Sequence, residues 1–370
     1  MDVPAPKYLF SPLTLGAIQL EHRVVMAPLT RLRSDVPGDL PGHLMLEYYT
    51  QRASRGGLII TEATTISERA RGYLGAPGLY TASQASGWER IVNAVHHKGG
   101  TIVSQLWHVG RSSHSDFLDG DVPAGPSAGA PYEATVYTKD GWVPVTPSRS
   151  LRLEEIPVIV EDYRRAASRA KEAGFDGIEI HSGNGYLLDQ FLQNGSNLRT
   201  DRYGGSIENR VRLLLEVVEA VMSVWPADRI GVRISPNTQF NGMHDSSPLE
   251  LFSYVGEALN AYRPAWLHII EPRIKGNTEI DEGLPPVAAS HLRKYFKGKI
   301  IAAGGFDAQS ADQLLGQGDA DAVAFGRHFI ANPDLPERFR LGRSLNHYDR
   351  STFYGGDARG YTDYPALQTT

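Results

Sequence analysis

Cysteine is absent from this 370-residue chain, which excludes several kinds of chemistry at once. Without thiols the protein has no disulfide, no thiolate metal site and no cysteine nucleophile. No apolar run is long enough to cross a membrane. The net charge is −5 and no Lys/Arg-rich run or basic tail is present, which argues against a nucleic-acid partner. The N-terminus lacks a basic segment followed by an apolar core, so we predict no signal peptide and a cytoplasmic location.

Short apolar runs that do not alternate strictly recur along the chain, separated by helical patterns. Such runs are typical of strands buried on both faces of a parallel sheet. A doubly wound sheet would place Gly-x-Gly-x-x-Gly after its first strand, and Met26–Thr30 does not fit that pattern. We therefore predict one α/β domain over residues 1–370, a (β/α)8 TIM barrel. The eight expected strands are 23–28, 58–63, 101–107, 177–181, 230–235, 266–271, 299–304 and 322–325.

The expected helices are 84–98, 160–173, 206–224, 248–262, 287–296, 308–317 and 332–339. One connection, 108–157, is rich in Gly, Pro and Ser and contains no convincing helix. Because it follows the third strand, we predict an excursion that lies over the barrel mouth, with Val143–Val145 in a small hairpin. A second hairpin, around Pro12–Gly16, is expected to close the barrel floor.

The segment 177–192 is the most informative part of the chain, because a strand stops there at a polar, Gly-rich loop. His181, Asn184 and Tyr186 provide an imidazole, an amide and a phenol within six residues, and all three can donate hydrogen bonds to a small-molecule oxygen. Barrels build their active sites from such strand ends. No acid pair stands out, and the histidines lack metal-ligand spacing, so no metal site is predicted.

A lone arginine, Arg233, interrupts the apolar fifth strand and needs an anionic or acceptor partner. An internal salt bridge, for example with Glu271, is as plausible from sequence as a ligand contact. After strands seven and eight, Gly304, Gly305, Gly326 and Arg327 suit a phosphate, which such barrels often bind at this place. Plain tight turns are the alternative for the glycines.

Several motifs, taken in order along nearly the whole chain, resemble those of the Old Yellow Enzyme family of FMN-dependent ene-reductases. Within it, the resemblance is to the branch with pentaerythritol tetranitrate reductase and morphinone reductase, and to oxophytodienoate reductases. Together the motifs are specific, although each alone is weak. They are 22–31, 61–64, 71–73, 104–111, 201–210, 322–327, 331–334, 352–355 and 360–365.

The resemblance implies FMN across the barrel mouth and either NADPH or NADH as its reductant in a ping-pong cycle. The implied flavin contacts include the Thr30 hydroxyl on O4, and Gln105 and Arg233 at the pyrimidine edge, where reduced flavin gains negative charge. The four residues after strands seven and eight are then expected to hold the phosphate. The implied cofactor-binding residues are Pro28, Leu29, Thr30, Ala63, Gln105, His181, Arg233, Gly304, Gly305, Gly326 and Arg327.

The resemblance also implies the substrate and the catalytic groups. His181 and Asn184 would donate to the oxygen of an enone or nitroalkene, and Tyr186 would protonate the α-carbon as general acid. Without the resemblance, Trp107 and Tyr354 fit core aromatics, Tyr186 a packing residue and Tyr73 a surface loop. The implied substrate-side residues are Tyr73, Trp107, His181, Asn184, Tyr186 and Tyr354.

The chain departs from the family at Ser182-Gly183, where a small pair ending in Ala is usual; Gly183 adds backbone freedom to the loop. Three alternatives stay open: reduction of nitrate esters or nitroaromatics, a non-flavin phosphate-binding lyase or isomerase, and a flavin-binding sensor without turnover. The lyase needs a lysine or an acid pair at a strand end, and none is apparent. The sequence leaves open whether the protein is a monomer or a dimer.

Overall fold

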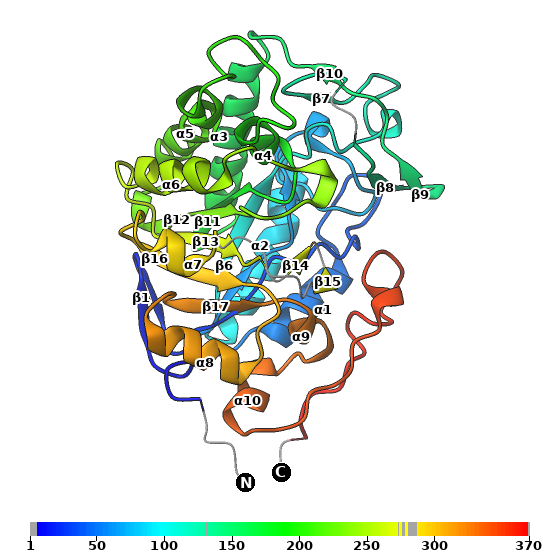
Figure 1. Cartoon of the computed structure of the whole chain (residues 1–370). Coiled ribbons are helices and arrows are strands. Elements are labelled where there is room, and N and C mark those ends of the chain that lie inside the picture. Colours follow the sequence, from blue (N-terminus) through cyan, green and yellow to red (C-terminus); the bar gives the residue numbers. More distant parts are fainter. Residues whose placement is uncertain (1–5, 130–131, 273, 276–277, 280–286, 369–370) are drawn as a thin grey trace.

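A closed barrel of parallel strands forms the centre of the computed structural model, which describes residues 6–129, 132–272, 274–275, 278–279 and 287–368 (Figure 1). Hydrogen bonding runs in the order β11-β12-β13-β16-β17-β3-β4-β6, and β6 pairs with β11 to close the ring. The predicted (β/α)8 barrel is thus confirmed. Its strands are β3 (Val24–Met26), β4 (Leu58–Ile60), β6 (Thr101–Trp107), β11 (Gly177–Ser182), β12 (Ile230–Ile234), β13 (Trp266–Ile270), β16 (Lys299–Ala303) and β17 (Ala322–Phe325).

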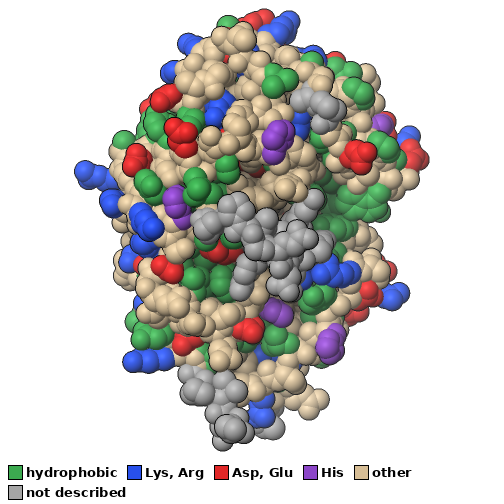
Figure 2. All heavy atoms as spheres, viewed as in Figure 1, with side chains coloured by type: hydrophobic (Ala, Val, Ile, Leu, Met, Phe, Trp, Pro, Cys, Tyr) green, Lys and Arg blue, Asp and Glu red, His purple; other side chains and the backbone are tan. Residues whose placement is uncertain are grey.

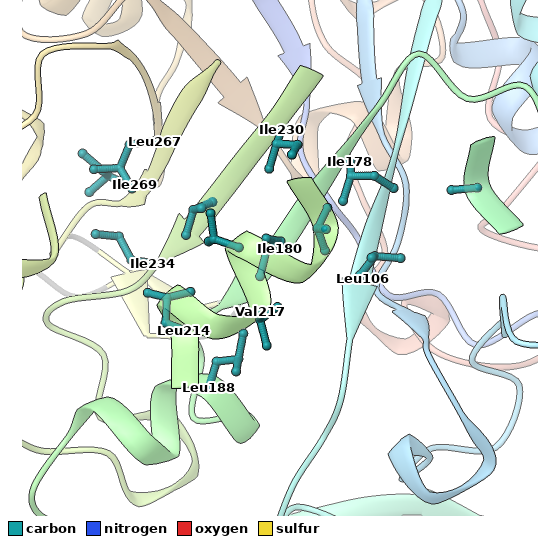
Figure 3. Close-up of a cluster of buried hydrophobic side chains, with 14 of the residues drawn as sticks. Leu106, Ile178, Ile180, Leu188, Leu214, Val217, Ile230, Ile234, Leu267 and Ile269 are labelled. Atoms are coloured by element: carbon teal, nitrogen blue, oxygen red, sulfur yellow. The ribbon is translucent and has the colours of Figure 1, made fainter. Parts of the chain in front are cut away.

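Helices surround the barrel and bury its outward side chains (Figure 1). Figure 3 shows this layer where Ile178 and Ile180 of β11 face Leu214 and Val217 of α5. Because residues two apart share a face of a strand, Glu179 and His181 point into the barrel instead. The helices are α1 (His43–Arg52), α2 (Ala82–His97), α3 (Ile156–Glu172), α4 (Leu187–Leu192), α5 (Ile207–Met222), α6 (Pro248–Leu259), α7 (Ala289–Leu292), α8 (Ala308–Gln317), α9 (Arg327–Ala331) and α10 (Leu335–Arg340).

Two small hairpins occupy opposite ends of the barrel. β1 (Leu13–Leu15) pairs with β2 (Ile18–Leu20), and their apolar side chains join the cluster inside the barrel, so this hairpin closes the floor as predicted. The predicted excursion carries β8 (Thr135–Thr138) and β9 (Gly141–Pro144), which pair antiparallel and include Val143. Shorter strands are β5 (Thr64–Thr65), β7 (Ala124–Gly125), β10 (Arg149–Ser150), β14 (Ile274–Lys275) and β15 (Thr278–Glu279), and short 3₁₀ turns are 68–70, 115–117, 227–229, 240–242 and 350–352.

The structure corrects some helix assignments. The helix expected at 332–339 begins only at Leu335, as α10, because Asn332 is extended at φ −130° and ends a separate helix, α9, that was not predicted. α1 and α4 were not predicted at all. Within the described residues, no helix is both long and apolar enough to cross a membrane.

Candidate active site

A cavity of 1170 Å³ opens at the carboxyl ends of the barrel strands. This volume suits a bound cofactor together with a substrate, since ligand sites usually measure roughly 300–1,000 Å³. All predicted cofactor-binding residues line it: Pro28, Leu29, Thr30, Ala63, Gln105, His181, Arg233, Gly304, Gly305, Gly326 and Arg327. Tyr73, Asn184, Tyr186 and Tyr354 line it too. Trp107 is the exception, since its buried ring stacks behind Tyr73 with centroids 5.6 Å apart.

A fully buried hydrogen-bond network lies beneath the cavity, inside the barrel. The carboxylate of Glu179 accepts from Gln105 Nε2 at 2.8 Å, from Trp266 Nε1 at 2.9 Å and from His268 Nδ1 at 2.9 Å. We call these four residues the barrel network. Although burial opposes ionisation, His268, the charge of Arg233 and the bond from Trp266 hold the pKa of Glu179 below its usual range. A buried carboxylate therefore sits under the cavity floor.

The barrel network fixes which atom Gln105 presents to the cavity. An ionised carboxylate only accepts hydrogen bonds, so the amide nitrogen must face Glu179. The amide oxygen is buried and has no partner among the described residues. Gln105 thus offers an acceptor at the cavity floor.

Arg233 supplies a positive charge at the same floor. Burial lowers its pKa to about 10, and the charge of Glu179 works in the opposite direction, so the guanidinium stays protonated at neutral pH. Its Nε is buried and has no partner within the described part of the chain. The acid whose charge acts on Arg233 is therefore Glu179, which lies on the neighbouring strand.

His181, near the end of β11, and Tyr186, in the loop that follows, both face the cavity. Burial and then the charge of Arg233 hold the pKa of His181 well below its usual value, so its imidazole is neutral and has one N–H to donate. The two rings lie edge to face at 5.4 Å. Burial raises the pKa of Tyr186 to about 12, and its hydroxyl donates to the hydroxyl of Tyr73 at 3.4 Å. Tyr186 therefore keeps its proton at neutral pH.

An aromatic rim surrounds the open side of the cavity, and we define it as Tyr73, Tyr137, Trp142 and Tyr354. Trp142, on β9, contacts the other three rings at centroid distances of 5.4 to 6.3 Å. It is 48% exposed. Figure 2 shows hydrophobic side chains gathered beside the β8–β9 hairpin. Tyr137 and Trp142 were not predicted from the sequence, because a long irregular connection has no repeating pattern that shows which side chains face the cavity mouth.

A segment near the C-terminus forms one wall of the cavity. Two buried arginines near the N-terminus of the chain hold this segment in place. Arg31 donates to the carbonyls of Phe353 and Gly360, both at 2.8 Å. Arg33 donates to the carbonyls of Thr352, Asp357 and Arg359 at 2.9 to 3.2 Å. These bonds place the C-terminal wall, residues 352–360, and with it Tyr354 beside the cavity.

Glu62 supports the turn from which these arginines extend. Its carboxylate accepts from the backbone N–H of Arg31 at 3.1 Å and from the Tyr49 hydroxyl at 3.2 Å. Burial raises the pKa of Glu62 to about 7.

The residues around the cavity fit FMN. An amide acceptor and a guanidinium donor, both buried and lacking partners among the described residues, suit the polar edge of a flavin. At the phosphate end, Gly304 and Gly305 have φ of +139° and +65°, which lets backbone N–H groups turn toward an anion. Arg327 lines the same end and adds positive charge.

Comparisons with known proteins agree with this site. A model of the NADH:flavin oxidoreductase / NADH oxidase family matches residues 8–346. The chain is 48% identical to 12-oxophytodienoate reductase 1 of Oryza sativa subsp. japonica, over 97% of this chain and 93% of that protein. It is 46% identical to flavin oxidoreductase hxnT of Emericella nidulans, over 97% and 98% of the two proteins.

Solved structures of morphinone reductase share both fold and sequence with this chain. One, in complex with tetrahydroNAD, has a TM-score of 0.90 and 50% identity, covering 97% of this chain and 98% of the other. A second morphinone reductase structure has a TM-score of 0.91 and 51% identity, covering 97% and 96%. The family match and these identities to flavin oxidoreductases exclude the non-flavin lyase and the flavin-binding sensor as functions of the chain. The chain therefore belongs to the NADH:flavin oxidoreductase / NADH oxidase family, that is, the Old Yellow Enzyme family, and is an FMN-dependent oxidoreductase that consumes NADH or NADPH.

Proposed function

We propose that the enzyme reduces the activated C=C bond of α,β-unsaturated carbonyls or nitroalkenes. The observation that carries this proposal is the wall formed by His181, Asn184 and Tyr186, which faces the same cavity as the FMN-binding floor. It offers two neutral hydrogen-bond donors and one phenol, as polarisation of an oxygen and protonation of a carbon require. The residues of the cavity floor would hold FMN, which would supply, after reduction by the nicotinamide, a hydride for the β-carbon.

The protein's own groups then have distinct roles. His181 and Asn184 donate to the substrate oxygen and stabilise the negative charge that develops there. The pKa of Tyr186, about 12, keeps its proton available until a more basic carbanion forms at the α-carbon. The bond to the Tyr73 hydroxyl holds this phenol at the cavity wall. At the floor, Gln105 and Arg233 would bind the pyrimidine edge of FMN, and Arg327 with Gly304 and Gly305 its phosphate.

Steady-state kinetics with 2-cyclohexenone and NADPH or NADH tests this function. We expect a Tyr186→Phe variant to lose enone reduction by about 10²-fold or more while keeping reduction of its flavin by nicotinamide, because only the proton donor is removed. Unchanged enone turnover in this variant would contradict the role of Tyr186.

A binding experiment tests the donor pair independently of turnover. Phenols that stack on oxidised FMN with their oxygen at His181 and Asn184 should give a long-wavelength charge-transfer band. A His181→Ala, Asn184→Ala double variant is expected to retain FMN and lose this band. Normal phenol binding in the double variant would show that the oxygen site lies elsewhere.

A further inference from the structure

The loop that carries Asn184 has an unusual backbone. Asn184 and Gly185 are consecutive left-handed residues, with φ of +55° and +71°. For residues with a side chain this region costs roughly 1–2 kcal/mol, although asparagine tolerates it better than most. The loop therefore needs contacts that hold Asn184 in this conformation.

One such contact comes from the end of the neighbouring strand. Ser235, which follows β12 and is fully buried, accepts the backbone N–H of Asn184 on its Oγ at 2.6 Å. The approach depends on Gly183, because a Cβ at that position would lie 2.9 Å from Ser235 Oγ and 3.1 Å from Ser235 N. The glycine that departs from the family pattern is thus what permits this close contact.

The second contact comes from α4. Asp189, also fully buried, accepts the backbone N–H of Gly185 at 2.8 Å. The same carboxylate oxygen accepts from Ser235 Oγ at 3.4 Å, and the other oxygen accepts from Gln193 Nε2 at 2.8 Å. The serine hydroxyl and the aspartate carboxylate therefore form one connected unit under two successive N–H groups.

A third contact holds the carbonyl of the Asn184–Gly185 peptide group, whose N–H bonds to Asp189. Asn241, in the turn at 240–242, donates its Nδ2 to the carbonyl of Asn184 at 3.0 Å. The backbone of Asn184 is therefore held at both its N–H and its C=O, while the residue lines the cavity.

We propose that Ser235 and Asp189 are positioning residues, which set Asn184 in its left-handed conformation so that its amide binds the substrate oxygen. The inference rests on the proposed function, because it assigns Asn184 the oxygen-binding role. Neither residue touches the substrate, and both act through the backbone of the loop.

The test uses Ser235→Ala in the FMN-loaded enzyme, with the dissociation constant of a phenol read from its charge-transfer band. Losing the Ser235 hydroxyl, which accepts the Asn184 N–H, is expected to weaken phenol binding about tenfold, as the loss of one buried hydrogen bond implies. KM for 2-cyclohexenone should rise by a similar factor, with kcat changed less. FMN content and flavin reduction by nicotinamide should stay as in the wild type.

A double-mutant cycle separates positioning from general disturbance. If Ser235 acts through Asn184, then Ser235→Ala adds nothing to phenol binding in an Asn184→Ala background. Ser182→Ala is the matched control, because Ser182 is an equally buried neighbour whose hydroxyl has no partner among the described residues. This control is expected to bind phenol normally. Asp189→Asn, which keeps the side-chain volume, provides a second variant with the same expected behaviour should Ser235→Ala fold poorly.

Each outcome either supports or overturns the proposal. Wild-type phenol affinity in Ser235→Ala or, where that variant does not fold, in Asp189→Asn overturns it. If Ser235→Ala weakens phenol binding equally in the wild-type and Asn184→Ala backgrounds, the proposal is also overturned, because the effect would then not depend on the Asn184 amide. If Asn184→Ala alone leaves phenol binding unchanged, the donor role in the proposed function fails first and this inference fails with it. If Asn184→Ala weakens binding and neither positioning variant does, only this inference is wrong.

Discussion

The two ends of the cavity are built in contrasting ways. The barrel network at the floor is almost wholly buried, since Gln105, Glu179, Trp266 and His268 are each at most 1% exposed. It is held by directional hydrogen bonds that join β11 to β6 and, across β12, to β13. The aromatic rim has Trp142 at 48% and Tyr354 at 36% exposure, and ring packing holds it together.

This contrast indicates how the tasks are divided. A buried polar network is costly to alter, because every donor that loses its acceptor stays away from water. Ring contacts at a half-exposed rim tolerate changes of shape, since water can take the place of a lost neighbour. We therefore expect the floor to govern folding and cofactor binding, and the rim to govern substrate size.

The strongest challenge to this division is Glu179→Gln. Whichever way the new amide turns, its NH₂ group faces at least one of the three buried donors that Glu179 accepts from. We expect the free energy of unfolding to fall by about 4 kcal/mol and FMN affinity to fall with it, as measured by urea titration and flavin release.

A surface glutamate is the control for this variant. Glu161→Gln on α3 removes only exposed ion pairs with Arg164 and Arg165 and should change stability by less than about 1 kcal/mol. Equal stability of the two variants would show that a change in the barrel network costs no more stability than the loss of exposed ion pairs.

The pH dependence of stability tests whether the buried carboxyl group of Glu62 is protonated in the folded protein. Burial raises the pKa of Glu62 from 4.5 to about 7 in the folded protein. The folded state then holds its proton more tightly than the unfolded state, so this group's contribution to stability is lost as the pH rises from 4.5 to 7. Relative to wild type, the free energy of unfolding of Glu62→Gln should rise by up to about 3 kcal/mol as the pH increases over this range. A flat difference between their denaturation curves across that range would mean that Glu62 ionises normally.

Arg33→Met tests the C-terminal wall, which belongs to the rim side of the site. Loss of the guanidinium leaves the carbonyls of Thr352, Asp357 and Arg359 without this donor and is expected to destabilise the segment by about 2 kcal/mol. Hydrogen exchange should speed up at residues 352–360 and stay slow in the barrel strands.

Arg359→Met is the matched control for the C-terminal wall. Its side chain is 78% exposed and lies 3.9 Å from the carboxylate of Asp349, so its removal should leave exchange unchanged. If Arg33→Met instead accelerates exchange throughout the barrel, the wall and the barrel unfold as one unit.

The smallest expected effect comes from Trp142→Ala at the rim. FMN content and stability should change by less than about 1 kcal/mol, because the ring is half exposed. KM for a polycyclic enone should rise about fivefold through lost ring contacts, while KM for 2-cyclohexenone stays within about twofold. An equal rise for both substrates would assign Trp142 to general access and not to substrate size.

Sequence periodicity predicted the barrel well, because strands buried on both faces have short apolar runs that little else resembles. The strands at 101–107 and 322–325 were predicted with the bounds that the structure shows. α4 was missed because its six residues directly follow the polar loop and are too short to show a helical repeat. α1 was missed because its apolar side chains, Leu44–Leu46 and Tyr48–Tyr49, are adjacent in sequence and form no clear stripe.

The candidate site was predicted less evenly. Most of the cavity-lining residues named from family motifs do line the cavity, whereas Trp142 at the rim and the residues that support the site were not predicted. Glu179 was within reach, because it shares its strand face with His181 and is a charge in an apolar strand. Ser235 and Asp189 were not, since their bonds join positions 46 and 51 residues apart with no local pattern to link them.

The bonds that Arg31 and Arg33 make to the C-terminal wall have a consequence for biosynthesis. Arg31 and Phe353 are 322 positions apart, so a ribosome that has produced the last barrel strand, ending at Phe325, has not yet made the carbonyl acceptors in the C-terminal wall. At about 5–20 residues per second, the missing segment takes roughly two to seven seconds more. During that interval the guanidinium groups of Arg31 and Arg33 keep, among the described residues, only their hydrogen bonds to the Tyr48 hydroxyl and the Arg31 carbonyl, and the enzyme acquires its last wall only as translation of the wall segment ends.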